Sequence, residues 1–176
     1  MPLFIPSAAL NCVTDITPSL LHELKAEALL LDVDNTLALD GSQKPFCGTV
    51  EWSHKICSDG FKVMILSNNF SKRVEPFAEQ YGLPYLSMAM KPLPVGYLRA
   101  ASRLCVRRER TVVVGDQIFT DILGANLAGM KSILLVPVKE EDSLSFRVRR
   151  RLEQPIRRRI ERRFGKETEQ AEDDKN

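Results

Sequence analysis

The sequence contains no pattern of cysteines that would bind zinc or form a disulfide framework. Its four cysteines lie in separate segments and form no CxxC pair; they are Cys12, Cys47, Cys57 and Cys105. Zinc sites and small disulfide-bonded folds both depend on paired cysteines at close spacing. We therefore expect a protein of a reducing compartment that contains neither.

Long apolar runs and an N-terminal targeting pattern are absent as well. No run reaches the roughly 20 apolar residues that a transmembrane helix needs. No basic residue precedes His22, whereas signal peptides and organelle transit peptides carry basic residues near their start. These absences predict a cytoplasmic protein, although an imported protein without its leader would look the same.

What the chain does have is the composition of one globular domain. Its 176 residues are 44% hydrophobic and 27% charged, which is typical of a folded core rather than of general disorder. The formal net charge of +2 conceals a local excess, because nine arginines lie between Arg147 and Arg163, where the only acids are Glu153 and Glu161. After this segment, five acids face two lysines.

Strand-like and helix-like patterns alternate along the first 138 residues. Apolar runs bounded by turn residues predict strands in residues 27–33, 61–69, 83–88, 110–117 and 131–138. Apolar residues at helical spacing predict helices in residues 48–60, 71–82, 93–106 and 118–129. Such alternation is typical of parallel strands joined by right-handed crossovers. The predicted fold is a three-layer α/β/α sandwich around a five-stranded parallel sheet.

Polar side chains follow four of the five predicted strands. They are Asp32 and Asp34 after the first strand, Ser67 and Asn68 after the second, Lys91 shortly after the third, and Asp116 and Asp121 after the fourth. In an open parallel sheet, ligands bind at the carboxyl ends of the strands. We therefore expect these side chains to converge on one edge of the sheet.

Three or four carboxylates at one edge repel each other unless a cation lies among them. Carboxylate oxygens suit a hard ion, so Mg²⁺ is the expected cofactor, and Mn²⁺ is an alternative that the sequence leaves open. A lysine and a hydroxyl next to that ion would bind the oxygens of a phosphate dianion. These residue types together predict a phosphate site beside a magnesium ion.

Each of these signals is weak when it stands alone. An Asp-x-Asp pair after a strand is often a turn or a helix cap, a Ser-Asn-Asn turn is common, and most isolated lysines lie on the surface. Four such signals in order, at four strand ends, favour a catalytic site. Arg73 and Asp40 lie near the same edge and are interpreted as surface residues, and His22 and His54 have no partner at metal-binding spacing.

The four segments resemble the four motifs of the haloacid dehalogenase (HAD) superfamily in order and spacing. They are DVDNT from Asp32, ILSNN around Ser67, KP at Lys91 and GDQIFTD from Gly115, and the resemblance covers roughly residues 27–138. The segments FKVMILSNN, KPLP and LLVPV are similar to the YqeG family of HAD phosphatases. Relatives of that family in mitochondria and plastids are phosphatidylglycerophosphate phosphatases.

The resemblance implies that phosphate passes first to the protein and then to water. Asp32 would be the nucleophile that forms an aspartyl phosphate. Asp34 would be the general acid for the leaving alcohol and then the general base for water. The side chains of Asp32 and Asp116, with the backbone carbonyl of Asp34, would bind Mg²⁺.

The resemblance also implies roles for five further residues. Ser67, the backbone N–H of Asn68 and the side chain of Lys91 would bind the phosphate oxygens. Thr36 would hold the loop after the first strand in place. Asp121 would act either through the water shell of the metal or by orienting Lys91.

The sequence leaves no room for the cap domain that many HAD enzymes insert over their site. Only LALDGSQKPFCG separates the first motif from the next predicted helix, and only a few residues separate the third strand from Lys91. An open rim fits a substrate that brings its own bulk, such as a lipid headgroup on a membrane, a protein or a nucleic acid.

The basic segment has the period of an amphipathic helix. Every fourth residue is apolar, with arginines between, at Leu144, Val148, Leu152, Ile156, Ile160 and Phe164. Pro155 is expected to kink the segment or to start a second helix. A basic amphipathic helix is typical of contact with anionic lipid. Packing on the body of the protein is the next alternative, and nucleic-acid binding is the least favoured.

These features predict three regions along the chain. They are a HAD phosphatase domain in residues 1–138 with its motif core in residues 27–138, a basic amphipathic segment in residues 139–164, and a disordered acidic tail in residues 165–176. The tail combines many charges with almost no apolar residues. The first 13 residues are apolar without a clear period, so they either pack across the sheet edge or contact lipid.

The predicted function is magnesium-dependent hydrolysis of phosphatidylglycerophosphate to phosphatidylglycerol by a cytoplasmic protein, peripheral at the inner membrane face. The basic segment from Arg147 to Arg163 would bind the anionic surface. A phosphatase for a soluble nucleotide, sugar or phosphoprotein is one alternative, and a non-catalytic module that binds phosphate or nucleic acid is another. The named lipid depends on the family resemblance, and neither protein partners nor an oligomeric state are predicted.

Overall fold

The computed structural model describes residues 3–136, 151 and 153–164. Six parallel strands form one sheet in the order β1-β6-β5-β2-β3-β4. The strands are β1 (Ala8–Leu10), β2 (Ala28–Leu31), β3 (Lys62–Leu66), β4 (Tyr85–Leu86), β5 (Thr111–Gly115) and β6 (Lys131–Leu135). The predicted parallel α/β fold is confirmed, with six strands in place of five.

The additional strand, β1, comes from the apolar N-terminal stretch. It pairs in parallel with β6, with Ala8 opposite Ile133 and Leu10 opposite Leu135. Three residues are too few to display the alternation by which a strand is recognised in sequence. Of the two alternatives for this stretch, packing at the sheet edge is the one present in the structure.

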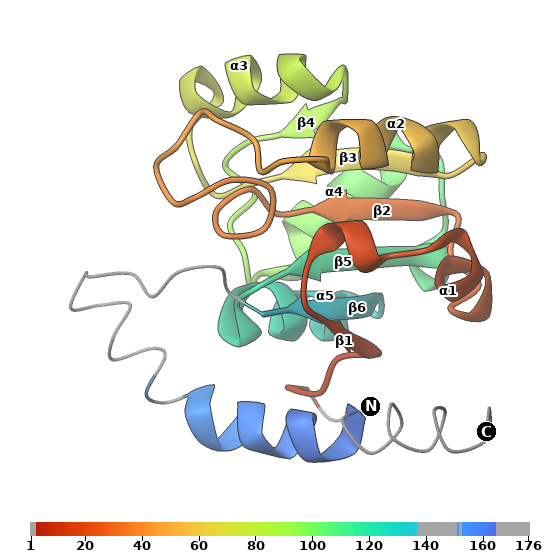
Figure 1. The fold of residues 1–176 in the computed structure, drawn as a ribbon, viewed down its shortest axis with the longest axis vertical. Coiled ribbons are helices and arrows are strands. Elements are labelled where there is room, and N and C mark those ends of the chain that lie inside the picture. Colours follow the sequence, from red (N-terminus) through yellow and green to blue (C-terminus); the bar gives the residue numbers. More distant parts are fainter. Residues whose placement is uncertain (1–2, 137–150, 152, 165–176) are drawn as a thin grey trace.

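Helices cover both faces of the sheet (Figure 1). They are α1 (Pro18–Glu23), α2 (Thr49–Ser58), α3 (Ser71–Tyr81), α4 (Pro94–Arg103) and α5 (Leu123–Ala128), and a π-helical segment, Ile118–Ile122, leads into α5. Leu29 and Leu31 of β2 pack in one core with side chains of α2 and α3, whereas Leu30 packs in another with α4 and α5. Successive strand side chains point to opposite faces, so this division confirms the three-layer sandwich.

Short connections follow the strands that carry the motifs. Residues 32–48 connect β2 to α2, and residues 87–93 connect β4 to α4. Within residues 3–136, no cap domain is inserted at either position. In the part of the chain that the structure describes, the carboxyl edge of the sheet therefore carries no cap domain, as the spacing of the motifs predicts.

Residues 151 and 153–164 of the basic segment form a helix that lies against the body of the protein (Figure 1). Ile160 is only 2% exposed and packs with Ile118, Ile122 and Leu134. The surface beneath this helix is thus apolar, and packing on the body is the alternative that the structure contains. The described residues on both sides of Pro155 are helical, so Pro155 does not itself start a helix. The earlier helix that the sequence allows would fall mainly on residues 139–150, which lie outside the described residues.

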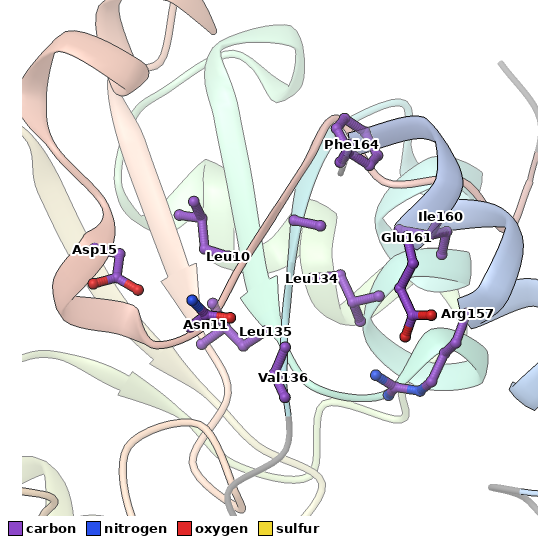
Figure 2. A pocket seen from close by; sticks show the side chains of 11 residues that line it. Leu10, Asn11, Asp15, Leu134, Leu135, Val136, Arg157, Ile160, Glu161 and Phe164 are labelled. Carbon is purple, nitrogen blue, oxygen red and sulfur yellow. The ribbon is translucent and has the colours of Figure 1, made fainter. Parts of the chain in front are cut away.

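The docked helix leaves a cavity of about 430 Å³ beside the edge strand β1 and its neighbour β6 (Figure 2). Its walls come from Leu10, Leu134 and Leu135 on the sheet side and from Arg157 and Ile160 on the helix side. None of the described helices is long and apolar enough to cross a membrane.

Part of the predicted organisation lies outside the described residues. This holds for the boundary at residue 138, for residues 139–150 with Leu144 and Val148, for the side chain of Leu152, and for the acidic tail in residues 165–176.

Candidate active site

The loop after β2 turns tightly and places two carboxylates at the sheet edge. The backbone N–H of Asp32 donates to the carbonyl of Val114 on β5 (2.9 Å), and the N–H of Thr36 donates to the carbonyl of Val33 (3.2 Å). Asn35 has a positive φ of 56°, a conformation that Asn accepts more readily than most residues. The loop is thus closed on itself directly after Asp32. The buried hydroxyl of Thr36 has no hydrogen-bond partner among the described residues.

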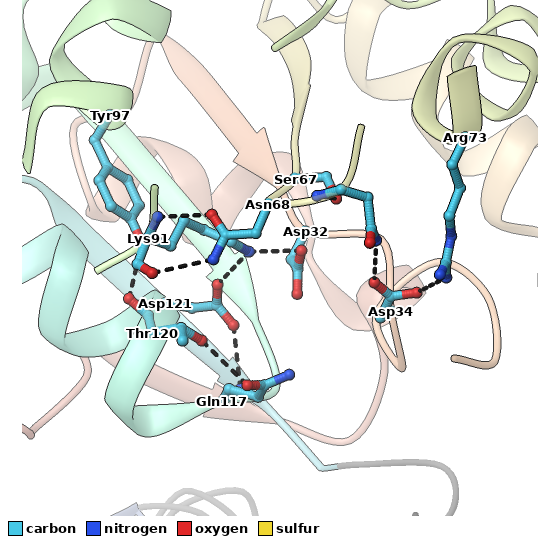
Figure 3. Close-up of polar contacts among 11 residues, drawn as sticks. Asp32, Asp34, Ser67, Asn68, Arg73, Lys91, Tyr97, Gln117, Thr120 and Asp121 are labelled. Atoms are coloured by element: carbon cyan, nitrogen blue, oxygen red, sulfur yellow. Dashed lines mark hydrogen bonds and ion pairs between the residues drawn. The ribbon is translucent and has the colours of Figure 1, made fainter. Parts of the chain in front are cut away.

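Lys91 bridges two buried carboxylates (Figure 3). Its Nζ lies 2.6 Å from Oδ1 of Asp32 and 2.7 Å from Oδ1 of Asp121, and the residue is only 9% exposed. Of the two roles considered for Asp121, direct contact with Lys91 is the one that this geometry contains. The contacts join the ends of three different strand connections, which lie far apart in sequence.

The ion pairs keep Lys91 charged in spite of its burial. Burial by itself would lower the pKa of Lys91, but the carboxylates of Asp121 and Asp32 outweigh it and raise the pKa. For Asp121, burial raises the pKa to about 7, assisted by the nearby charge of Asp32 and opposed by Lys91.

Asp116 completes a cluster of three buried carboxylates. One oxygen from each of Asp32, Asp116 and Asp121 lies within 4.8 Å of the others. When ionised, the three carry more negative charge than Lys91 alone can neutralise. An all-oxygen donor set with excess negative charge fits a hard divalent cation such as Mg²⁺, so these residues suit the metal that the sequence predicts.

The second motif, Ser67 and Asn68, holds the loop that carries Lys91 in place. The Asn68 side chain makes two contacts with the backbone of Lys91: its Oδ1 accepts from the N–H (2.7 Å) and its Nδ2 donates to the carbonyl (3.0 Å). Ser67 is buried, and its hydroxyl accepts from the N–H of Asn69 (3.1 Å). The sequence suggested only the backbone N–H of Asn68, so this positioning contact is an addition.

A cavity of about 510 Å³ opens above these residues. Five of the predicted site residues line it, namely Asp32, Asp34, Ser67, Asn68 and Lys91. The same wall includes Asp40, Asn69, Pro92, Gln117, Phe119 and Thr120. Asp116 and Asp121 are fully buried, and Asp121 contacts Lys91 directly. The structure thus brings together the predicted side chains of all four motifs.

Asp34 points away from Lys91 and toward α3 (Figure 3). Its carboxylate forms an ion pair with Arg73 and accepts a hydrogen bond from Nδ2 of Asn69 (2.8 Å). Burial and the charge of Asp32 raise the pKa of Asp34 to about 6, although Arg73 opposes them.

The interpretation of Arg73 as a surface residue is therefore incomplete. Its side chain is 33% exposed, yet it pairs with Asp34 and lies 3.7 Å from Asp40. One signal in the sequence could have found it. Arg73 is in the first turn of the helix that follows Ser67 and Asn68, and the first turn of that helix begins at the carboxyl edge of the sheet.

Replacing Gly115 with alanine is expected to damage this site. A Cβ at Gly115 would lie 2.3 Å from both Cγ and Oδ2 of Asp121, so the carboxylate must leave the position in which it contacts Lys91. Small displacements of catalytic groups can cost about 100-fold in rate, and we expect a loss of that order in hydrolysis of a soluble phosphate ester.

Gly82→Ala is the matched control for this prediction. It strains the backbone at a φ of 61° but places its Cβ within 4 Å of no neighbouring atom. Thermal unfolding and steady-state rates should be measured for both variants. If Gly115→Ala and Gly82→Ala lose activity to the same small extent, the close packing of Asp121 on Gly115 has no role in the site.

The fold and the site together define a HAD-like hydrolase. Residues 88–139, which carry the third and fourth motifs, match the HAD-hydrolase-like family. NagD from Escherichia coli K-12 has the same fold, with a TM-score of 0.55 and 15% identity over 68% of this chain and 90% of that one. The cobalt-bound deoxy-D-mannose-octulosonate 8-phosphate phosphatase (YrbI) of Haemophilus influenzae also shares it, with a TM-score of 0.53 and 17% identity over 62% of this chain and 69% of that one.

Sequence comparison narrows the class to one family. The chain is 35% identical over 153 residues to the probable phosphatase YqeG of Bacillus subtilis (strain 168). The match covers 87% of this chain and 89% of that protein. A shorter match to the glyceraldehyde 3-phosphate phosphatase of Methanopyrus kandleri has 44% identity over 52 residues. It covers 30% of this chain and 22% of that protein. The chain therefore belongs to the YqeG family of HAD-type phosphatases.

Proposed function

We propose that this phosphatase hydrolyses phosphomonoesters through an aspartyl phosphate on Asp32. The observation that carries the proposal is the position of Lys91 Nζ, within 2.7 Å of both Asp32 and Asp121 and on the wall of the 510 Å³ cavity. An oxygen of Asp32 would attack phosphorus while the ester P–O bond breaks. The ammonium of Lys91, with Ser67 and Asn68 beside it, would stabilise the charge on the phosphate oxygens.

Asp34 suits the proton transfers of this reaction. With a pKa of about 6, part of its population is protonated near neutral pH, as a general acid needs. It would give its proton to the leaving alcohol. The resulting carboxylate would then take a proton from the water that attacks the aspartyl phosphate, which releases phosphate and restores Asp32. Arg73 and Asn69 hold the Asp34 side chain on the cavity wall.

Asp32 and Asp116, with the backbone carbonyl of Asp34, would hold Mg²⁺. When bound, the ion would neutralise charge on the phosphate and on the carboxylates around it. The buried cluster of oxygen ligands supports this assignment, and the cobalt-bound Haemophilus influenzae phosphatase supports divalent-metal chemistry on the same fold.

For the substrate we propose phosphatidylglycerophosphate, presented at a membrane surface. Four exposed apolar side chains are each next in sequence to a residue that lines the uncapped cavity: Leu39, Phe70, Met90 and Leu93. Phe70 is 71% exposed. Exposed apolar residues so close to a phosphate site favour a substrate in which an apolar part lies next to the phosphate.

Two of these residues occupy positions where helices normally begin with a polar residue. Phe70 is the N-cap of α3 and Leu93 is the N-cap of α4, and neither side chain makes a capping hydrogen bond. Ser, Thr, Asp and Asn are strongly preferred at N-caps. Proteins tend to depart from such local preferences at functional sites. The exposed apolar side chains at these two N-cap positions therefore support a role in contact with lipid.

The basic segment also supports contact with a membrane surface, but through its charge and not through its apolar side. The apolar side of the helix packs on the body through Ile160, so lipid contact would use charge and not insertion of that side. Five arginines on the helix are exposed: Arg151, Arg158, Arg159, Arg162 and Arg163. Each could contribute on the order of 1 kcal/mol near an anionic membrane, and salt would weaken the effect.

The test compares phosphate release from phosphatidylglycerophosphate in anionic vesicles with release from a soluble nucleotide monophosphate. We expect lipid turnover to exceed nucleotide turnover by a wide margin. In the double variant Phe70→Ser and Leu93→Ser, lipid turnover should fall about tenfold, because two apolar side chains that would move from water into lipid are lost. The loss of turnover on a soluble ester should be smaller. Serine is a good N-cap residue, so the variant should fold at least as well.

The alternatives predict other results. If only the soluble ester is hydrolysed efficiently, the proposed reaction stands and the proposed lipid substrate is wrong. If neither compound is hydrolysed, a binding module is favoured. Vesicle sedimentation with Arg158→Gln and Arg162→Gln, at low and high salt, tests the arginine face separately. Equal sedimentation of wild type with anionic and zwitterionic vesicles would contradict its proposed role.

A further inference from the structure

Glu153 is a buried carboxylate on the basic helix that contacts the loop of the fourth motif. The residue is only 1% exposed. Its Oε1 accepts from the backbone N–H of Ile118 (2.9 Å) and lies 3.4 Å from the N–H of Phe119. These two amides begin the π-helical segment that follows Asp116, where backbone N–H groups lack partners within their own helix.

Arg157 holds the other side of the same loop. Its guanidinium donates to the backbone carbonyl of Asp116. The same Nη2 lies 3.2 Å from Oε2 of Glu153, one helical turn away, and the Arg157 side chain is 17% exposed. Glu153 and Arg157 therefore form an ion pair that contacts the loop both at Asp116 and directly after it.

These contacts differ in kind from the remainder of the helix interface. Ile160 packs against Ile118 and Ile122 through apolar contacts, which attach the helix without specifying where individual backbone atoms lie. Hydrogen bonds to the carbonyl of Asp116 and to the N–H of Ile118 specify the path of the loop. That path decides where the Asp116 carboxylate meets Asp32 and Asp121.

We infer that Glu153 and Arg157 are positioning residues for Asp116, so that the basic C-terminal helix is part of the active site. The inference rests on the proposed role of Asp116 as a ligand of the cation. Groups that orient metal ligands typically affect metal affinity by about 10- to 100-fold. The same helix thus turns five arginines to solvent, and it turns the side chains of Glu153 and Arg157 to the loop that carries Asp116.

The test uses the full chain with Glu153→Ala, the conservative Glu153→Gln, and Gln154→Ala as a matched control. Gln154 is the exposed neighbour of Glu153 on the same helix. Three quantities should be measured: the unfolding temperature without metal, its rise with increasing Mg²⁺ in the absence of substrate, and hydrogen–deuterium exchange of the amides in residues 116–119.

For Glu153→Ala we expect the Mg²⁺ concentration at half-maximal stabilisation to rise about tenfold, and exchange at residues 118 and 119 to increase at least about tenfold. Glu153→Gln should recover part of both effects, because its amide oxygen can still accept from Ile118. Gln154→Ala should match the wild type.

A purely structural role gives a different pattern. If Glu153→Ala lowers the unfolding temperature but leaves Mg²⁺ affinity and the exchange of residues 118 and 119 at their wild-type values, the inference is wrong. A wild type that binds Mg²⁺ but hydrolyses no ester would contradict the proposed function alone. If Mg²⁺ does not stabilise the wild type, the proposed metal site fails, and exchange at residues 118 and 119 still decides whether Glu153 holds the loop.

Discussion

Asp32→Asn is expected to lower the hydrolysis of a soluble phosphate ester by at least about 1,000-fold, in line with the loss of a catalytic nucleophile. Asparagine keeps the size of the side chain but lacks the carboxylate oxygen that would attack phosphorus. Lys91 retains its partner Asp121 at 2.7 Å, so the fold should survive. Phosphate release at saturating Mg²⁺ and the unfolding temperature should be measured on the same preparation.

Asp59→Asn is the matched control, because Asp59 is an exposed residue at the end of α2. It should retain wild-type activity. A folded Asp32→Asn variant that keeps more than a few per cent of the wild-type rate would sink the covalent mechanism.

Lys91→Met is expected to remove activity and to destabilise the protein strongly. Lys91 contacts Asp32 and Asp121, which are both buried. Breaking a buried ion pair by removal of one partner typically costs about 3–5 kcal/mol, because the other charge is left uncompensated. We expect a decrease of that size in the free energy of unfolding, measured by urea denaturation without metal, together with loss of phosphate ester hydrolysis.

A double variant separates charge from packing in this prediction. Lys91→Met combined with Asp121→Asn removes both partners of one ion pair, so it should be more stable than Lys91→Met alone. Lys55→Met, at an exposed position on α2, controls for the loss of a lysine and should change stability by less than about 1 kcal/mol. If the single and the double variant are equally unstable, packing and not unpaired charge explains the loss.

The position of the four motifs could be predicted because parallel strands have an invariant geometry. A buried strand such as β2 is apolar along its length, and the next polar residue, Asp32, marks its carboxyl end. Parallel neighbours all end on the same edge. The convergence of Asp32, Ser67, Lys91 and Asp116 therefore follows from alternation and order alone, without knowledge of any side-chain contact.

Short elements and partner choice could not be predicted in the same way. β1 has three residues and is defined by its pairing with β6, which no local pattern encodes. Arg73 is polar and partly exposed, like most surface arginines, and only the direction of α3 brings it to Asp34.

The basic helix shows the division most clearly. Its amphipathic period was visible in the sequence, but the period states only that one side of the helix is buried and not what buries it. In the structure, that side packs on Ile118, Ile122 and Leu134 instead of on lipid. The buried carboxylate of Glu153, one of only two acids among nine arginines, acquires its meaning from the amides of Ile118 and Phe119.

The sequence by itself therefore determined which residue types gather at the sheet edge, and these residue types predict a hard divalent cation and a phosphate group there. It could do so because apolar runs mark where each strand ends, and because strands that alternate with helices run parallel to one another. Only the tertiary structure decided which groups hold those residues in place, namely Asn68 for Lys91, Arg73 for Asp34, and Glu153 with Arg157 for the Asp116 loop. Those contacts join segments up to 41 residues apart, and hydrogen bonds across such separations depend on how whole elements pack, which local sequence does not encode.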